Sequence, residues 1–103
     1  MRVAVVFLAS FMFVLVSALT PLAADVAAGQ ALYSGCMGCH GSTGNGGVGP
    51  KLSGQPAEQL AAALKKYRMG QTIGARSGMM MPVASNLSDA DIENLSVYLS
   101  SLK

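Results

Sequence analysis

The sequence predicts an all-α protein, and three observations indicate this class. Apolar residues recur at helical spacing in three stretches, glycine-rich connections separate these stretches, and no run alternates with period two for long enough to form a strand. The first helix is expected from about Val26 to Ser34. Its apolar residues are Val26, Leu32 and Tyr33, and Gly29 allows another segment to approach closely.

The second and third helices have characteristic beginnings. The second is expected from near Gln55, because Pro56 and Glu58 suit the first turn of a helix, and Gly70 suits its end. Its apolar face comprises Leu60, Leu64 and Tyr67. The third is expected after Ser88, a residue type that caps helix N-termini. Its apolar stripe comprises Ile92, Leu95, Leu99 and Leu102, with Tyr98 alongside.

Residues 1–24 have the pattern of a secretory signal peptide. Arg2 is the only charge before Asp25, Val3–Leu19 is apolar apart from two serines, and the small residues Ala23 and Ala24 follow. The apolar run of 17 residues is longer than the roughly 7–15 of a signal peptide and shorter than the roughly 20 of a membrane span. We expect a signal that is cleaved after Ala24, with an uncleaved N-terminal anchor as the alternative.

Residues 25–103 would then form the functional domain. Removal of 24 residues from 103 leaves 79, with six Lys+Arg and five Asp+Glu, a formal net charge of +1. This balance excludes a nucleic-acid binder that relies on a strong basic field, and the length excludes a multidomain enzyme. Nothing after Asp25 is apolar for long enough to span a membrane. A chain of this size seldom folds on an apolar core alone, so a bound group is expected.

The segment Cys36-Met37-Gly38-Cys39-His40 contains both cysteines and the only histidine of the chain. Two thiols at i and i+3 lie on the same side of a helical turn and can bond both vinyl groups of a haem, while the next residue places an imidazole under the iron. A redox dithiol is the first alternative, but it normally needs a βαβ setting. A structural zinc site is the second, but it needs four ligands. The motif therefore predicts one covalent haem c held by Cys36 and Cys39, with His40 as an axial ligand.

A methionine is the expected sixth ligand, because the chain has no second histidine. Met37 lies inside the attachment motif and cannot reach the opposite haem face, and Met69 ends the second helix. The run Met79–Pro82, expected as an extended stretch before the third helix, is the natural candidate. A thioether on iron stabilises the ferrous state and raises the reduction potential. The alternative is that these methionines only pack against the haem edge or form a docking surface.

These residues resemble the class I c-type cytochromes, and more closely the small bacterial monohaem group, which is similar to one half of the periplasmic dihaem cytochromes c. The resemblance implies three to four helices packed around one covalently bound haem. Ala28–Tyr33 looks like the family's N-terminal helix, where Gly29 and Tyr33 would meet Tyr98.

The same resemblance extends to two loops. Gly49–Gln55 is similar to the segment whose proline carbonyl accepts a hydrogen bond from the haem-ligating imidazole. Pro50 would therefore fix the tautomer of His40, the alternative being an ordinary turn proline. Met80–Asp89 looks like the family's ligand loop, in which the iron-bound methionine stands seven residues before the leucine that precedes the capping serine. That count implies Met80 as the ligand, ahead of Met79 and Met81.

The implied function is that of a periplasmic, monomeric one-electron carrier. It would shuttle electrons between a donor and an acceptor protein of a respiratory or related chain, and it would not be an enzyme. The alternatives are a small haem enzyme or gas-sensing module with an open sixth site, and a haem subunit of a larger oxidoreductase.

The charged side chains allow two further expectations. Positive residues gather on the second helix and acidic residues on the third: Lys65, Lys66, Arg68, Asp89, Asp91 and Glu93. We expect solvated faces, with weak steering of a redox partner as the alternative. Arg76 is a candidate partner for a haem propionate.

Overall fold

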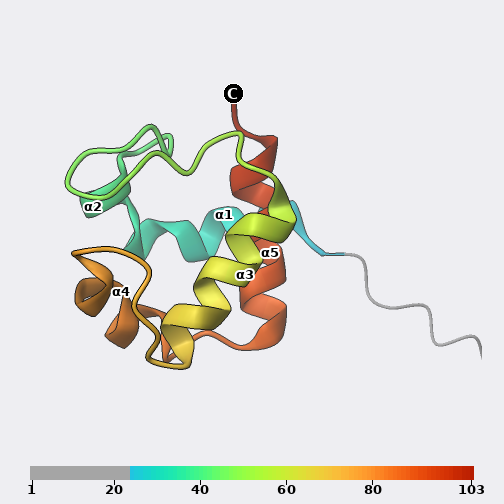
Figure 1. The fold of residues 1–103 in the computed structure, drawn as a ribbon. Coiled ribbons are helices and arrows are strands. Elements are labelled where there is room, and N and C mark those ends of the chain that lie inside the picture. The colour runs from blue at the N-terminus through green and yellow to red at the C-terminus, as the bar shows by residue number, and fades with distance from the viewer. Residues whose placement is uncertain (1–23) are drawn as a thin grey trace, which may run out of the picture.

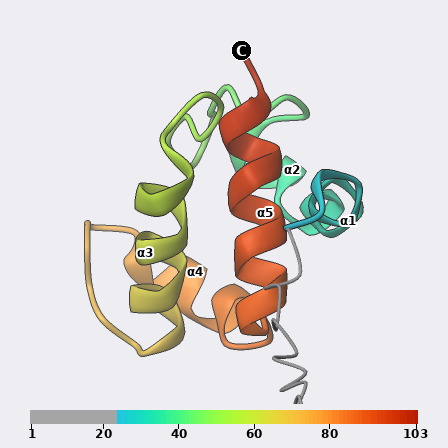
Figure 2. The same ribbon diagram turned by 90° about the vertical axis from the view of Figure 1, so that its right-hand side faces the viewer.

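Helix α5 (Asp89–Ser101) is the element around which the others assemble in this computed structural model, which describes residues 24–103. Helices α1 (Val26–Leu32) and α3 (Ala57–Arg68) both pack on α5, and Figure 2 shows α5 standing between them. Helix α4 (Ser77–Ala84) packs on α3 (Figure 1). A 3-10 turn, η1 (Tyr33–Gly35), and the short helix α2 (Met37–His40) lead from α1 into the glycine-rich loop.

The all-α prediction is confirmed, since residues 24–103 contain helices and no strand. None of the helices in this part of the chain has the length and apolar character that crossing a bilayer requires. The predicted signal peptide lies, except for Ala24, outside the described residues.

The helix beginnings follow the sequence signals, with one shift. The hydroxyl of Ser88 accepts from the backbone N–H of Asp91 at 3.0 Å, and the Asp91 carboxylate accepts from the Ser88 N–H at 3.0 Å, which is a capping box. Pro56 lies one residue outside α3 instead of in its first turn, because its ψ of 133° is extended. Gly70, with a φ of 77°, follows the end of α3 in the left-handed region that favours glycine.

The core forms around α5, where η1, at the end of α1, and α3 pack against it. Tyr33, Leu60, Leu95, Tyr98 and Leu99 make one buried cluster, and the rings of Tyr33 and Tyr98 lie 5.7 Å apart. Gly29 permits the close approach of α1 to α5, since a Cβ there would stand 2.0 Å from the backbone oxygen of Asn94. The predicted meeting of Gly29 and Tyr33 with Tyr98 is thereby confirmed.

The methionine run is helical, and the prediction of an extended stretch was wrong. Met79–Pro82 lies inside α4, and Pro82 is the sixth of its eight residues. A proline this late in a short helix removes a single i→i−4 hydrogen bond. The turn before α4 is held by the Ser77 hydroxyl, which accepts from the N–H groups of Ile73 and Gly74 at 2.8 Å each.

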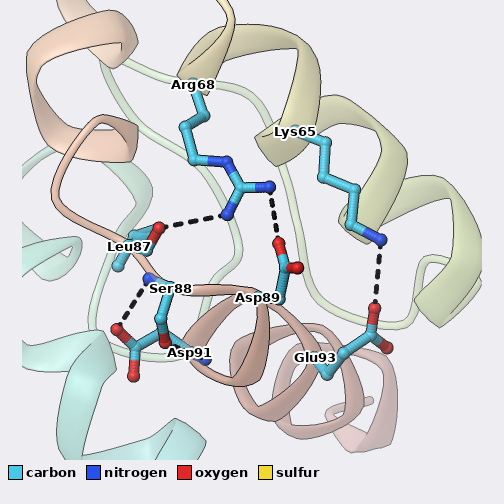
Figure 3. Close-up of polar contacts among 7 residues, drawn as sticks. All are labelled: Lys65, Arg68, Leu87, Ser88, Asp89, Asp91 and Glu93. Carbon is cyan, nitrogen blue, oxygen red and sulfur yellow. Dashed lines mark hydrogen bonds and ion pairs between the residues drawn. The ribbon is translucent and has the colours of Figure 1, made fainter.

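Two basic residues of α3 pair with two acidic residues of α5, so the charges do not form two independent faces. Arg68 Nη2 lies 2.6 Å from Asp89 Oδ1, and Lys65 Nζ lies 3.4 Å from Glu93 Oε1. Figure 3 shows both pairs bridging the two helices. Arg68 also donates to the carbonyl of Leu87 at 3.2 Å. The side chains of Lys65, Glu93 and Asp89 remain solvated, whereas that of Arg68 is only 28% exposed, and the pairing joins the end of α3 to the start of α5.

Candidate haem-binding site

A cavity of about 580 Å³ lies between the glycine-rich loop, α3 and the segment that leads into α4. Its polar and sulfur-bearing lining includes Cys36, Cys39, His40, Met79 and Met80. Its apolar lining includes Val48, Leu52, Leu60, Leu64, Ile73, Val83 and Leu99. In Figure 1, α2, which carries the histidine, lies above α4, which carries the methionines. The structure thus gathers residues that are 40 positions apart in sequence around one apolar space.

His40 is held in a single tautomer by the loop that follows it. The residue is 4% exposed, and Nδ1 lies 2.8 Å from the carbonyl oxygen of Pro50. A carbonyl can only accept, so Nδ1 carries the proton and Nε2 of the neutral ring keeps its lone pair. Nε2 is therefore the nitrogen that can ligate a metal, which is the tautomer that haem iron requires.

The glycine-rich loop returns to α2 and hydrogen-bonds to its last two residues. The N–H of Gly46 donates to the His40 carbonyl, and the N–H of Gly49 donates to the Cys39 carbonyl, each at 2.8 Å. Gly46 has a φ of 103°, which other residues rarely adopt. These hydrogen bonds satisfy carbonyls at the end of α2 and bring the chain back against the His40 ring, so this loop is a wall of the cavity.

The two cysteines line the cavity and do not bond to each other. Burial, and the neighbouring Cys39 thiol, raise the pKa of the Cys36 thiol above its ordinary value. A redox dithiol needs the opposite shift, toward an easily formed thiolate. Within residues 24–103 no three His, Cys, Asp or Glu side chains converge on a metal-sized space, so the zinc alternative gains no support either.

Two of the five methionines in the described part of the chain reach the cavity. Met80 is partly buried in its lining, while Met79, which also lines it, is 56% exposed. Met37, Met69 and Met81 are not among the lining residues. The sequence predicts Leu60, Leu64 and Tyr67 as the apolar face of a helix, and in the structure all three line this cavity. Ile73 and Ser77 also line the cavity, and no sequence signal indicates them. Gln55, the last residue of the segment Gly49–Gln55, lines it as well.

The model of one protein family, cytochrome c, matches residues 26–103, which is nearly all of the described chain. The chain belongs to the cytochrome c family. Cytochrome c-554(548) of Halomonas halodenitrificans is 42% identical to it over 81 residues, covering 77% of this chain and 98% of that protein. Cytochrome c-553 of Nitratidesulfovibrio vulgaris is 37% identical, covering 78% of this chain and 81% of that one.

A solved structure supports the same fold. Reduced recombinant cytochrome c4 from Pseudomonas stutzeri matches with a TM-score of 0.70 at 35% identity, over 76% of this chain and 48% of that chain. This cytochrome c thus spans about half of the c4 chain, as its resemblance to one half of a dihaem cytochrome implies. It has the class I cytochrome c fold.

Membership of the family decides the cofactor and the class of function. The protein binds one covalently attached c-type haem, and it is an electron carrier and not an enzyme. Its residues fit that group: the cavity is mostly apolar, two thiols and an imidazole line it, and the imidazole nitrogen that is free to bind iron is the one that Pro50 leaves unprotonated. The predicted fold class, cofactor and non-enzymatic role are confirmed.

Proposed function

We propose that this cytochrome c is a periplasmic one-electron carrier in which Cys36 and Cys39 hold the haem and His40 and Met80 ligate its iron. The observation that carries the proposal is the single cavity whose lining includes all four of these side chains. The bound haem supplies an Fe(III)/Fe(II) couple. The chain has to hold the same two ligands in both oxidation states, so that little rearranges when an electron is transferred.

On the histidine side, the chain orients the imidazole from two directions. The Pro50 carbonyl accepts from Nδ1 at 2.8 Å, and Gly49 lies directly against the ring. A hydrogen bond from Nδ1 to a carbonyl increases the basicity of the ligating nitrogen. Pro50 thus acts through His40, as the family resemblance implies for this proline.

On the methionine side, helix α4 presents the thioether. Met80 is partly buried where Met79 is mostly exposed, and Met81 is outside the lining, which favours Met80 among the three. A thioether is a neutral, soft ligand that favours the ferrous state and raises the potential. The apolar lining acts in the same direction, because a low-dielectric surrounding disfavours the more highly charged ferric state.

The described N-terminus is compatible with export and cleavage after Ala24. Ala24 is exposed, and α1 begins two residues later. The backbone nitrogen of Asp25 donates to Asn94 Oδ1 at 2.8 Å, and the Asp25 carboxylate accepts from the N–H of Ala27 at 2.9 Å. A mature protein that starts at Asp25 would keep both contacts, which supports this cleavage position. In the periplasm the monomer would exchange electrons with a donor and an acceptor protein.

The experiment that tests this proposal is a visible absorption spectrum of the protein matured in a bacterial periplasm, oxidised and then reduced. We expect sharp low-spin ferrous bands and the weak far-red ferric band of sulfur on iron. Met80→Ala should abolish the far-red band, whereas Met79→Ala and Met81→Ala, the matched controls, should keep it. Intact mass should equal residues 25–103 plus one haem.

Three results would contradict the proposal. A high-spin wild-type spectrum that shifts readily with carbon monoxide would indicate an open sixth site. Loss of the far-red band only in Met79→Ala would assign the iron ligand to Met79 instead of Met80. An intact mass that includes residues 1–24 would indicate an uncleaved N-terminal anchor instead of a cleaved signal peptide.

A further inference from the structure

The haem cavity has two rims that come from different parts of the chain. One is the glycine-rich loop, where Val48, Gly49 and Pro50 follow each other beside the His40 ring. The other is the segment 71–84, which carries Met79 and Met80 and packs on α3. In Figure 1 these rims lie apart, as the green loop and the orange segment on the same side of the molecule.

One hydrogen bond joins the two rims. Arg76 Nη1 donates to the backbone carbonyl of Val48 at 2.8 Å, across 28 positions of sequence. Within residues 24–103 no other hydrogen bond links 41–54 to 71–84. The contact is therefore the only direct polar tie, in the described part of the chain, between the loop that orients the histidine and the helix that presents the methionine.

Both ends of this tie lie close in sequence to the proposed iron ligands. Arg76 is the residue before α4, and its backbone carbonyl accepts from the N–H of Met79 at 3.0 Å. Val48 precedes Gly49, which touches the His40 ring and whose own N–H is bonded to Cys39. A movement that carries α4 away from the cavity must therefore break the bond between Arg76 and Val48 or distort the loop beneath the histidine.

We propose that Arg76 is a positioning residue, a strap that holds the methionine rim against the histidine rim. It would slow the replacement of the Met80 thioether by an external ligand. The inference rests on the proposed His40 and Met80 ligation. A guanidinium suits this role, because its long side chain spans the gap and its planar array of donors keeps one N–H directed at a carbonyl. The hydrogen bond from Arg76 to the Val48 carbonyl forms without a haem propionate, and the other N–H donors of the guanidinium can still bind one.

The test measures how readily an external ligand replaces the methionine. Imidazole is added to the ferric holoprotein, and the loss of the far-red sulfur-to-iron band is followed in wild type, Arg76→Ala, Arg76→Lys and Lys66→Ala. Lys66→Ala is the matched control, because it removes one exposed positive charge outside the strap. We expect replacement to be about three- to tenfold faster in Arg76→Ala, the range that corresponds to one lost hydrogen bond. Arg76→Lys should be intermediate and Lys66→Ala unchanged.

The outcomes separate this inference from the proposed ligation. If Arg76→Ala keeps the band and binds imidazole at the wild-type rate, the strap is wrong and the ligation stands. If Arg76→Ala changes only the reduction potential and its pH dependence, with the same imidazole rate, Arg76 serves a propionate and the strap is again wrong. If wild type lacks the far-red band, the ligation itself fails.

Discussion

The Cα of Gly49 lies so close to the ring of His40 that a methyl group at this position would stand 2.5 Å from Cε1. The same loop, one residue later, supplies the Pro50 carbonyl that accepts from Nδ1. Glycine at 49 is therefore a requirement of the histidine's position, and its effect comes from the absence of a side chain, since its backbone is not in the left-handed region.

Gly49→Ala tests this relationship. Because the new methyl group meets the ring at 2.5 Å, the ring or the loop has to move, which lengthens the bond between His40 and Pro50. We expect the free energy of unfolding of the holoprotein to fall by about 1–3 kcal/mol. The reduction potential should rise, since a less basic imidazole stabilises ferric iron less. Denaturation and potentiometry measure the two effects.

Gly38→Ala is the control for that variant. A Cβ at Gly38 meets nothing within 4 Å, and the residue lies in the attachment motif itself. If Gly49→Ala and Gly38→Ala both keep the wild-type reduction potential and stability, the contact between residue 49 and the His40 ring does not limit the size of the side chain there.

Gly29→Ala should separate α1 from α5. The added Cβ would stand 2.0 Å from the Asn94 oxygen and 2.8 Å from the Tyr98 Cβ, so the two helices must move apart. The gain in helix propensity is at most about 1 kcal/mol, and overpacking costs about 1–3 kcal/mol or more, so the net effect is a loss of stability. Guanidinium denaturation of the holoprotein measures it. Gly78→Ala, where a Cβ meets nothing within 4 Å, should be neutral or slightly stabilising, and an equal effect of both changes would contradict this view.

The ion pair between Asp89 and Arg68 predicts that part of the free energy of unfolding depends on pH in the acid range. The hydrogen bond and the charge of Arg68 hold the pKa of Asp89 below its ordinary 3.8. A carboxyl group whose pKa is lower in the folded state stabilises that state above the unfolded pKa, and the contribution is lost as pH falls through the folded pKa. The stability difference between wild type and Asp89→Asn should therefore be present at neutral pH and shrink below about pH 4, and high salt should reduce it. Denaturant titrations from pH 7 to pH 2 measure it.

Glu58→Gln is the control for the acid dependence, because it removes one negative charge from a helix start without touching the Arg68 pair. A difference between wild type and Asp89→Asn that stays constant over this pH range would show that the Arg68 pair is not its source.

The haem itself is expected to complete the core. The buried hydrophobic cluster is small, and the apolar residues around the cavity face a space of about 580 Å³ that the polypeptide alone leaves open. Cys36→Ala with Cys39→Ala should abolish covalent haem and leave the chain largely unfolded, because no other staple is present in residues 24–103. Circular dichroism and dispersed NMR signals measure this, and a well-folded haem-free variant would contradict it.

Much of the site was accessible from the sequence, because its strongest signals are local. Cys36, Cys39 and His40 are neighbours in the chain, and their spacing alone places three side chains on one helical turn. The capping serine at 88 and the apolar stripe after it are equally local, and both were found where predicted. Pro50 and Met80 were reached only through a family resemblance, since neither has a local pattern that distinguishes a ligand or an orienting carbonyl from an ordinary turn.

The failures share a physical cause, which is that long-range contacts override local preference. Met79–Pro82 was expected to be extended, yet packing on α3 and the Ser77 turn make it helical despite Pro82. The charges of α3 and α5 gave no sign of pairing, because Arg68 and Asp89 are 21 positions apart and meet only when the helices pack.

Local patterns in the sequence are enough to predict the class of the protein. They are an attachment motif whose chemistry suits haem, helical periodicities, and a chain too short to fold well on its own apolar residues. The tertiary structure decided which residues share one cavity, that Gly49 and Pro50 hold the histidine ring, and that Arg76 reaches Val48. The reason is physical. Spacing along a helix specifies only residues within a few turns of one another, whereas a cavity is formed by segments that distant packing brings together.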